Sequence, residues 1–313
     1  MLKLPEDGVA LQRLRRLSVS AQDCVETLAA RPDPNHHPVL WGHLERCHHA
    51  LTSEMGIGLP ASGYKGFPAL SLESGPVGMH LYVWLYLSVL PDVRRFHVSR
   101  DIADETSWVT LSDLGRGMQE HRAIHGTSGI GRFGQWCPPL RFRGTEYSLG
   151  RLAYDRGRGE LPNGDTGQLL TIHIPSGDPL TTDSCESSFR QALDFFERHF
   201  PDEPVAAFVC HSWLLDPQLG EYLPADSNIM RFQRRFELGP LNPSAVHDFC
   251  DTDVLEYVFG KAIDESKRAD DLLDSLPQDT TMRRAFTTHL RSGRHWHART
   301  GWISFGRVVG STG

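Results

Sequence analysis

The chain has 313 residues, of which 39% are hydrophobic and 23% are charged, and its formal net charge is −7. The length allows two domains, each with its own core, and the composition is typical of a globular protein. The negative charge argues against nucleic acid as the main partner, because nucleic-acid binding requires a basic surface.

The cysteines and the N-terminal residues indicate a cytoplasmic protein. The six cysteines are widely spaced and include no CxxC pair, which is typical of reduced thiols. Residues 1–30 carry charges among their apolar positions, unlike a signal peptide. The most apolar run, Met79–Pro91, is too short to span a bilayer and ends at a proline, so it predicts a buried core helix rather than a membrane segment.

The first part of the chain, to about residue 135, predicts helices and little strand. Apolar residues recur at helical spacing in four segments. These are residues 11–28 (as one helix or a pair), His43–Met55, Met79–Leu90 and Asp104–His121. Residues 59–78, rich in Gly and Pro, predict a loop with a short helical turn at Ala69–Leu72, and Gly126–Gly134 predicts a linker.

Beyond this linker the pattern changes to strands mixed with helices. The predicted elements are a hairpin of Leu140–Glu146 and Tyr147–Asp155, a turn at Gly157–Gly167, a strand at Leu169–Pro175, a helix over 181–200, a strand at Val205–Trp213, helices at Ser244–Phe259 and Thr280–Ser292, and a strand at His295–Phe305. We therefore expect an α+β chain with a helical domain over residues 1–135, a mixed-sheet domain of α/β type over 136–305 and a flexible tail over 306–313.

The segment from Leu169 to Phe236 is the most informative part of the sequence. Its first strand leads through a Gly/Pro turn at Pro175–Pro179 into the start of an amphipathic helix. The first amides of a helix have no partner within the helix and bind anions well. The segment therefore predicts either a site for a phosphate-bearing cofactor or an ordinary strand–helix–strand core unit with a tight loop.

Four side chains near the predicted strand ends are candidates for catalysis. His173 lies within a strand, on the face opposite Ile172, and is either a general base or a core histidine bonded to a backbone carbonyl. Cys210 and His211 point to opposite faces of the next strand, so His211 does not activate the thiol, and a structural cysteine is the simpler interpretation. Tyr222, on a short helix after that strand, is either a proton donor or a packing residue.

Other motifs of known chemistry have little support. The chain has no Walker A loop, no GxGxxG after a strand, no GxSxG elbow and no HExxH. His295 and His297 form an HxH pair on the last predicted strand, and zinc binding there would need further ligands from elsewhere. With 16 histidines such pairs arise by accident, so we predict no metal site.

Several motifs together resemble a known family. They are HIPSGDPL, FFERHFP, FVCHSWLLDPQLGEYLP, SNIMRFQRRF and SGRHWHARTGW. They resemble two-domain acyltransferases of actinomycete type, in which a helical N-acyltransferase domain precedes a GNAT-like domain. The resemblance is strong over residues 140–305 and looser over 1–135. It implies direct transfer of an acyl group from acetyl-CoA or another acyl-CoA to a small-molecule amine acceptor.

The resemblance also implies where the site lies. In the GNAT fold two neighbouring strands splay apart and hold acyl-CoA between them, with the pyrophosphate on the amides that open the next helix. Here those strands are Leu169–Pro175 and Val205–Trp213. We predict His173 as general base with His211 in reserve, Tyr222 as acid and Cys210 as a further catalytic candidate. The predicted cofactor-binding residues are Ile174, Ser176, Gly177, Leu180, Thr181, Thr182, Ser212 and Asn228.

The chain departs from the family pattern at two places. Residues 176–179, Ser-Gly-Asp-Pro, stand where most GNAT enzymes have a Q/R-x-x-G-x-G/A loop, and Phe232 stands where the family's tyrosine is expected. A non-catalytic module that binds acyl-CoA or a protein partner on the same scaffold is therefore the second hypothesis. A metal-dependent enzyme using His295 and His297 is the third, and a homodimer stays open.

Overall fold

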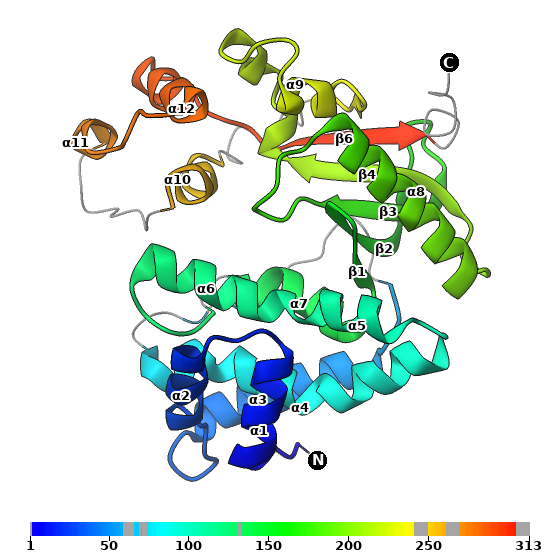
Figure 1. Ribbon diagram of the computed structural model, residues 1–313, viewed down its shortest axis with the longest axis vertical. Coiled ribbons are helices and arrows are strands. Elements are labelled where there is room, and N and C mark those ends of the chain that lie inside the picture. The colour runs from blue at the N-terminus through cyan, green and yellow to red at the C-terminus, as the bar shows by residue number, and fades with distance from the viewer. Residues whose placement is uncertain are drawn as a thin grey trace. The chain divides into compact units, whose positions relative to one another are not determined.

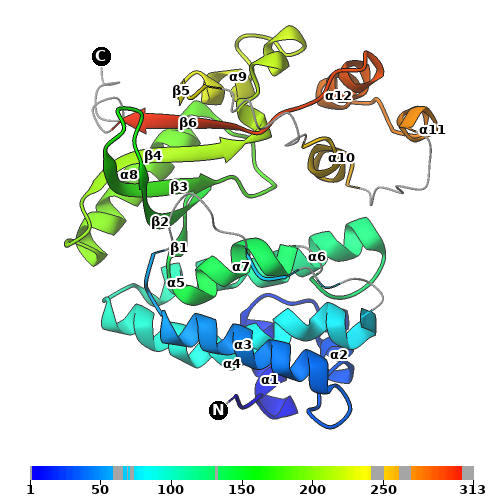
Figure 2. The same ribbon diagram turned by 180° about the vertical axis from the view of Figure 1, so that it is seen from behind.

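The computed structural model describes residues 2–58, 66–68, 70, 74–130, 133–240, 250–260 and 269–304. The chain divides into two compact units. Unit 1 comprises Met1–Ser148 with Asp155–Gly157, and unit 2 comprises Leu149–Tyr154 with Arg158–Gly313. Residues 136–148, which the sequence analysis assigned to the second domain, lie in unit 1. Figures 1 and 2 label the helices and strands of each unit.

Unit 1 is helical, as predicted. Its helices are α1 (Asp7–Arg16), α2 (Ala21–Ala29), α3 (Pro38–Ser53), α4 (Gly75–Ser99), α5 (Asp104–Leu111), α6 (Asp113–His125) and α7 (Phe133–Arg143). The central helix is α4, in which every residue from Gly78 to Leu90 is buried. A helix that is apolar around its whole circumference must be covered on all sides, and the predicted buried core helix is confirmed.

The predicted end of this helix at Pro91 is wrong, because α4 continues to Ser99. A proline lacks the N–H that would bond to the carbonyl four residues earlier, here that of Leu87. The side chain of Arg13 in α1 supplies a donor instead, with its Nη1 2.6 Å from the Leu87 oxygen. A residue far away in the sequence thus compensates for the missing bond and lets the helix pass through the proline.

A six-stranded mixed sheet is the main feature of the second half of the chain. The strands are β1 (Glu146–Leu149), β2 (Leu152–Glu160), β3 (Thr166–His173), β4 (Val205–Ser212), β5 (Glu237–Leu238) and β6 (Arg299–Ser304), in the order β1-β2-β3-β4-β6-β5. Strand β4 pairs with β3 in parallel and with β6 antiparallel. The parallel pair is joined by α8 (Thr182–His199), which lies across one face of the sheet (Figures 1 and 2).

The amphipathic pattern of α8 decides which side faces the sheet. Phe189 and Phe196 are buried, and the Phe189 ring lies 5.1 Å from that of Phe208 in β4. The charged residues of α8 lie on the opposite, exposed side. The helix predicted over residues 181–200 is therefore confirmed, with Thr181 as its N-cap.

The predicted hairpin is present but displaced along the chain. Residues 140–143 complete α7 instead of forming a strand, and the turn between β1 and β2 falls at Gly150. Gly144 and Gly150 have φ angles of 78° and 72°, a region that favours glycine, so these residues decide where the helix stops and where the hairpin turns. The predicted turn at Gly157–Gly167 is shorter in the structure, because Gly157 belongs to β2 and Gly167 to β3. Within it, the Leu161 N–H donates to the Asp165 oxygen at 2.8 Å.

Besides the contact of α8 with the sheet, unit 2 has a second hydrophobic cluster, which lies outside the sheet. Its elements are η2 (Trp213–Leu215), η3 (Pro217–Glu221), α9 (Asn228–Gln233), α10 (Asp251–Phe259), α11 (Ala269–Asp274) and α12 (Thr281–Arg291). Trp296 and Phe286 are fully buried in it, with ring centroids 4.5 Å apart. The predicted helix over 280–292 is α12, and that over 244–259 is α10 from Asp251 onward.

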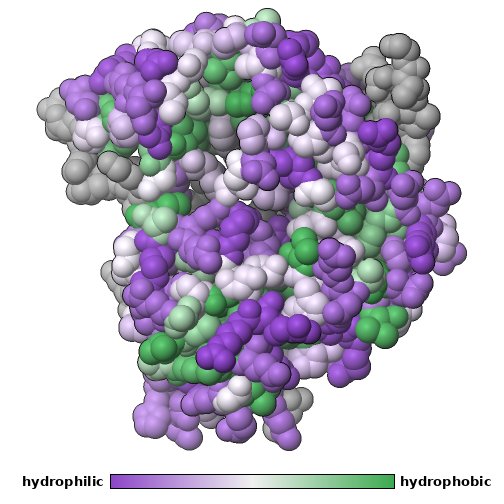
Figure 3. Space-filling model, viewed as in Figure 1, coloured by the Kyte–Doolittle hydropathy of each residue, from purple (hydrophilic) through white to green (hydrophobic). Residues whose placement is uncertain are grey.

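The last strand begins later than predicted, at Arg299, so His295 and His297 precede it. Residues 244–249, the tail 306–313 and the helical turn at Ala69–Leu72, except Leu70, lie outside the described residues. In the described part of the chain, no helix is both long and apolar enough to cross a membrane. The face in Figure 3 is mainly hydrophilic, with hydrophobic surface in separate patches.

Candidate functional site

Strands β3 and β4 are not paired along their whole lengths. The residue pairs run from Gln168–Val205 to Thr171–Val209, with an irregularity after Gln168. Strand β3 extends to His173, and β4 continues to Ser212, where it still pairs with β6. The β3–β4 pairing therefore stops before either strand ends, as a splay between these strands requires.

The loop after β3 leads directly into α8. Ser176 and Gly177 are exposed, whereas Leu180 is buried. Gly177 has a φ angle of 114°, which a residue with a side chain rarely adopts. The N-cap Thr181 accepts a hydrogen bond from the backbone N–H of Ser184 at 3.2 Å.

The first turn of α8 has the properties of an anion site. By helix geometry the amides of Thr182 and Asp183 have no acceptor within the helix. They therefore point their donors toward the loop end, where the positive end of the helix dipole also favours an anion. The phosphate-binding interpretation of this segment thus has a structural basis in the geometry of one helix start.

Two arginines of unit 2 lie beside this loop and helix. Arg151, in the β1–β2 turn, donates from Nε to the Asp178 oxygen at 2.7 Å and from Nη1 to the Pro175 oxygen at 2.9 Å. Arg235 forms an ion pair of 3.0 Å with Glu186 of α8. Sequence reasoning identified neither, because the contacts join residues 24 to 49 positions apart.

The charges of Arg151 and Arg235 affect the pKa of Cys185, a buried residue in the first turns of α8. Burial is the largest effect and raises the pKa of Cys185, while the guanidinium groups of Arg235 and Arg151 act in the opposite direction. The charges of both arginines therefore act near the start of α8.

His173 and His211 lie at the carboxyl ends of the two adjacent parallel strands. His173 is the last residue of β3, is half-buried, and lies beyond the last β3–β4 pair. His211 is exposed, and its Nδ1 lies 2.9 Å from the hydroxyl of Thr300 in β6. Ligands of such sheets bind at the carboxyl ends of the strands, so both histidines remain candidates.

Cys210 and Ser212, also on β4, are less suited to direct chemistry. Cys210 is completely buried, and burial raises the pKa of its thiol to about 12. A thiol in this environment is protonated at neutral pH and does not act as a nucleophile, which agrees with the structural alternative. The Ser212 hydroxyl accepts a hydrogen bond from the Leu214 N–H at 3.1 Å and caps η2.

Tyr222 directly follows η3 and contacts the second hydrophobic cluster. Its hydroxyl lies 3.1 Å from Nδ1 of His289, whose Nε2 lies 3.2 Å from the His295 carbonyl oxygen. The carbonyl can only accept, so Nε2 carries the hydrogen and Nδ1 accepts from Tyr222. Burial lowers the pKa of His289, in agreement with this neutral form. Asn228 is the half-buried first residue of α9, which Ser227 caps.

The premise of the metal hypothesis, two histidines on one strand, is wrong. His295 lies 2.7 Å from a carboxylate oxygen of Asp251, and His297 lies 3.5 Å from one of Asp216. The two imidazoles thus face different partners. Among the described residues, no group of three or more His, Cys, Asp and Glu is arranged to hold a metal ion.

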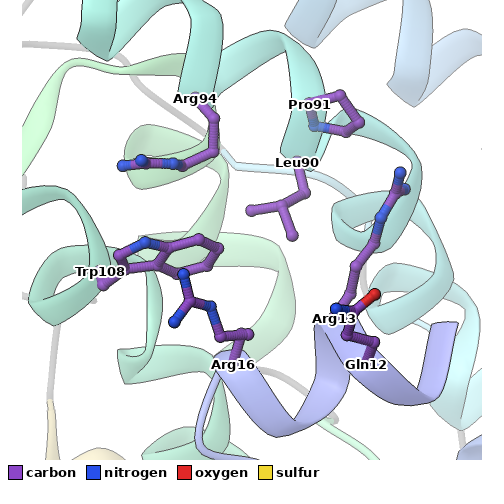
Figure 4. Close-up of a pocket in the computed structure, with 7 residues that line it drawn as sticks. All are labelled: Gln12, Arg13, Arg16, Leu90, Pro91, Arg94 and Trp108. Atoms are coloured by element: carbon purple, nitrogen blue, oxygen red, sulfur yellow. The ribbon is translucent and has the colours of Figure 1, made fainter. Parts of the chain in front are cut away.

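Unit 1 contains a pocket of about 250 Å³ that involves none of the predicted site residues (Figure 4). It is lined by Gln12, Arg13, Arg16, Leu90, Pro91, Arg94 and Trp108. The guanidinium carbons of Arg16 and Arg94 lie 4.5 and 4.7 Å from the Trp108 ring. These arginines connect α1, α4 and α5 by stacking on one indole, so the pocket is a feature of helix packing.

Comparisons with known proteins match both parts of the chain to domain families. Residues 10–144 match the model of an N-acyltransferase N-terminal domain, and residues 147–303 match that of a GNAT-like C-terminal domain. No curated protein matches the chain.

Solved structures of high similarity cover nearly the whole chain. An acyltransferase in complex with CoA and 10C-teicoplanin is 38% identical over 97% of this chain and 90% of its own, with a TM-score of 0.83. An acyltransferase in complex with decanoyl-CoA is 39% identical over 97% of this chain and 89% of its own, with a TM-score of 0.81. A mutant acyltransferase bound to octanoyl-CoA is 37% identical over 97% and 90%, with a TM-score of 0.82.

Proposed function

The chain belongs to the family of acyltransferases in which an N-acyltransferase N-terminal domain precedes a GNAT-like C-terminal domain, and from this premise we propose which substrates it takes and how it acts. It is an acyl-CoA-dependent N-acyltransferase. Its donor in this proposal is a medium-chain acyl-CoA, and its acceptor is a small-molecule amine similar to teicoplanin. The support is the near-complete similarity to acyltransferases solved with octanoyl-CoA, decanoyl-CoA and teicoplanin.

The observation that carries this proposal is the end of the β3–β4 pairing at Thr171 and Val209. The loop after β3 then leads into the first turn of α8, whose amides are suited to an anion. Beyond these residues the facing strand edges have backbone groups that β3 and β4 do not exchange with each other. The amides of a pantetheine arm bind such edges as an added strand does. Ser212 and Asn228 stay in the proposal as residues near the thioester end of the arm.

His173 is the general base of the proposed reaction. The substrate nitrogen attacks the thioester carbonyl, His173 takes the proton that the nitrogen loses, and the carbon–sulfur bond breaks. The departing CoA thiolate takes a proton from solvent, because the Tyr222 hydroxyl already donates to His289. The products are the amide and free CoA, and no redox partner is required.

Two measurements test this function. Calorimetry with CoA and decanoyl-CoA measures binding, and a thiol-release assay with deacylated teicoplanin and simple amines measures transfer. Binding with amine-dependent CoA release supports the enzyme. Binding without release under all conditions favours the non-catalytic module, and absence of binding overturns both.

A further inference from the structure

A side chain from the β1–β2 turn holds the loop that replaces the family's Gly-rich motif. We propose that Arg151 is a positioning residue for acyl-CoA: it fixes the loop over residues 175–178 and adds positive charge where the pyrophosphate binds. This inference rests on the proposed function and extends it to a residue that the family motif does not contain.

The contacts of Arg151 orient the loop backbone. Its Nε and Nη1 donate to the carbonyl oxygens of Asp178 and Pro175, one at each end of the loop. In a trans peptide the carbonyl and the following N–H point in opposite directions. With the Pro175 oxygen on the guanidinium, the N–H of Ser176 points away from Arg151, and Asp178 is followed by a proline without an N–H. Arg151 therefore takes the carbonyl side of the loop, and the Ser176 N–H points to the opposite side.

The position of Arg151 relative to α8 is itself fixed. Arg151 follows Gly150, whose positive φ forms the tight turn between β1 and β2. Ser188 of α8 is fully buried, accepts from the Leu152 N–H at 3.1 Å and donates to the Leu149 oxygen. The residues on both sides of the turn are thus attached to the same helix whose first amides form the anion site.

The charges explain why a cation is needed here. Asp178 and Asp183 bring two carboxylates to the loop and the first turn of α8, and both are exposed. They weaken the positive potential that the helix dipole and the first amides offer to an anion. A guanidinium fixed beside the loop offsets one of these negative charges, and Arg235 at Glu186 offsets charge further along α8.

The experiment compares three variants of the full chain, with CoA as the probe in calorimetry. Arg151→Met removes the charge and both hydrogen bonds, and Arg151→Lys keeps the charge without the two-point contact. Arg190→Met is the matched control, because Arg190 is an exposed arginine of α8. We expect the Kd for CoA to rise about 10- to 100-fold in Arg151→Met, with partial recovery in Arg151→Lys, and to change less than about twofold in Arg190→Met.

Steady-state kinetics separate positioning from a merely structural role. In Arg151→Met the KM for acyl-CoA should rise while kcat and the KM for the amine stay within about threefold of wild type. Binding of CoA equal to wild type in Arg151→Met overturns the inference and leaves the proposed function intact. A lower kcat with a rise in both KM values and a lowered melting temperature also overturns the inference, because this result indicates general damage to the fold. Failure of the wild-type protein to bind CoA overturns the proposed function as well.

Discussion

His173 differs from the other candidate histidine in its place on the sheet. It ends β3, at the point where this strand no longer pairs with β4, whereas His211 contacts Thr300 of β6. The proposed mechanism places the thioester where β3 and β4 no longer pair, and His173 lies on the strand that borders this position. This difference is why His173 is the first choice.

Replacing His173 by Ala should lower kcat/KM by about 10²- to 10⁴-fold, because a positioned general base contributes that much to a proton transfer. The thiol-release assay measures this change, and calorimetry should give an unchanged Kd for CoA. His49→Ala, at an exposed position of α3, is the control. Full activity of His173→Ala together with an inactive His211→Ala would transfer the role to His211.

Tyr222 donates to His289, whose ring lies 3.9 Å from that of Trp296 in the second hydrophobic cluster. Because its proton is already engaged, we expect Tyr222→Phe to keep kcat within about threefold of wild type. Leaving the Nδ1 acceptor of His289 without its donor should lower the free energy of unfolding by about 1–3 kcal/mol. Chemical denaturation and the thiol-release assay distinguish the two roles, and a large fall in kcat at unchanged stability would restore Tyr222 as the acid.

At the scale of elements, the bond between Arg13 and Leu87 shows how one helix supports another. Without Arg13, the buried Leu87 carbonyl would lack a donor at position 91, because proline has no N–H. The passage of α4 through a proline therefore depends on α1, and neither helix is explained by its own sequence alone.

Arg13→Met should lower the free energy of unfolding by about 1–3 kcal/mol, because a buried carbonyl loses its donor. In a Pro91→Ala background the backbone N–H is restored, so the same change should cost less. The difference is measured as a double-mutant cycle by chemical denaturation, with Arg15→Met, at an exposed position of α1, as control. Equal costs in both backgrounds would show that Arg13 acts through packing alone.

For the molecule as a whole, Asp155 makes stability depend on pH. Asp155 is buried in unit 1, and burial, together with the neighbouring Glu146, raises its pKa to about 7 from an ordinary value near 3.8. The folded state therefore keeps a proton that the unfolded state releases. The resulting stabilisation is fully present below pH 3.8 and is lost as the pH rises through 7.

Asp155→Asn removes this titration while keeping a neutral polar group of similar size. We expect wild type to lose roughly 2–3 kcal/mol more than the variant between pH 5 and pH 8. Buried histidines such as His97, whose pKa burial lowers to about 3, change stability with pH in both proteins alike, so the difference isolates Asp155. Denaturation curves at the two pH values that move in parallel would contradict the prediction.

The sequence alone predicted a helical half, a mixed-sheet half and a strand–loop–helix unit between Leu169 and Phe200. These follow from spacing, since apolar residues 3.6 or 2 positions apart decide which face of a helix or strand is buried. The motifs of residues 140–305 also identified the family. His173 was a candidate because a titratable group within a strand needs a partner or a role.

Only the tertiary structure decided where β3 and β4 part, where the hairpin turns and what holds the loop before α8. Arg151 lies 24 and 27 residues from the carbonyls that it binds, and Arg13 lies 74 residues from Leu87. The spacing of residues within one element carries no information on such partners, because a guanidinium can donate to any carbonyl oxygen within its reach. The choice is made when the elements pack and bring each carbonyl next to a particular donor.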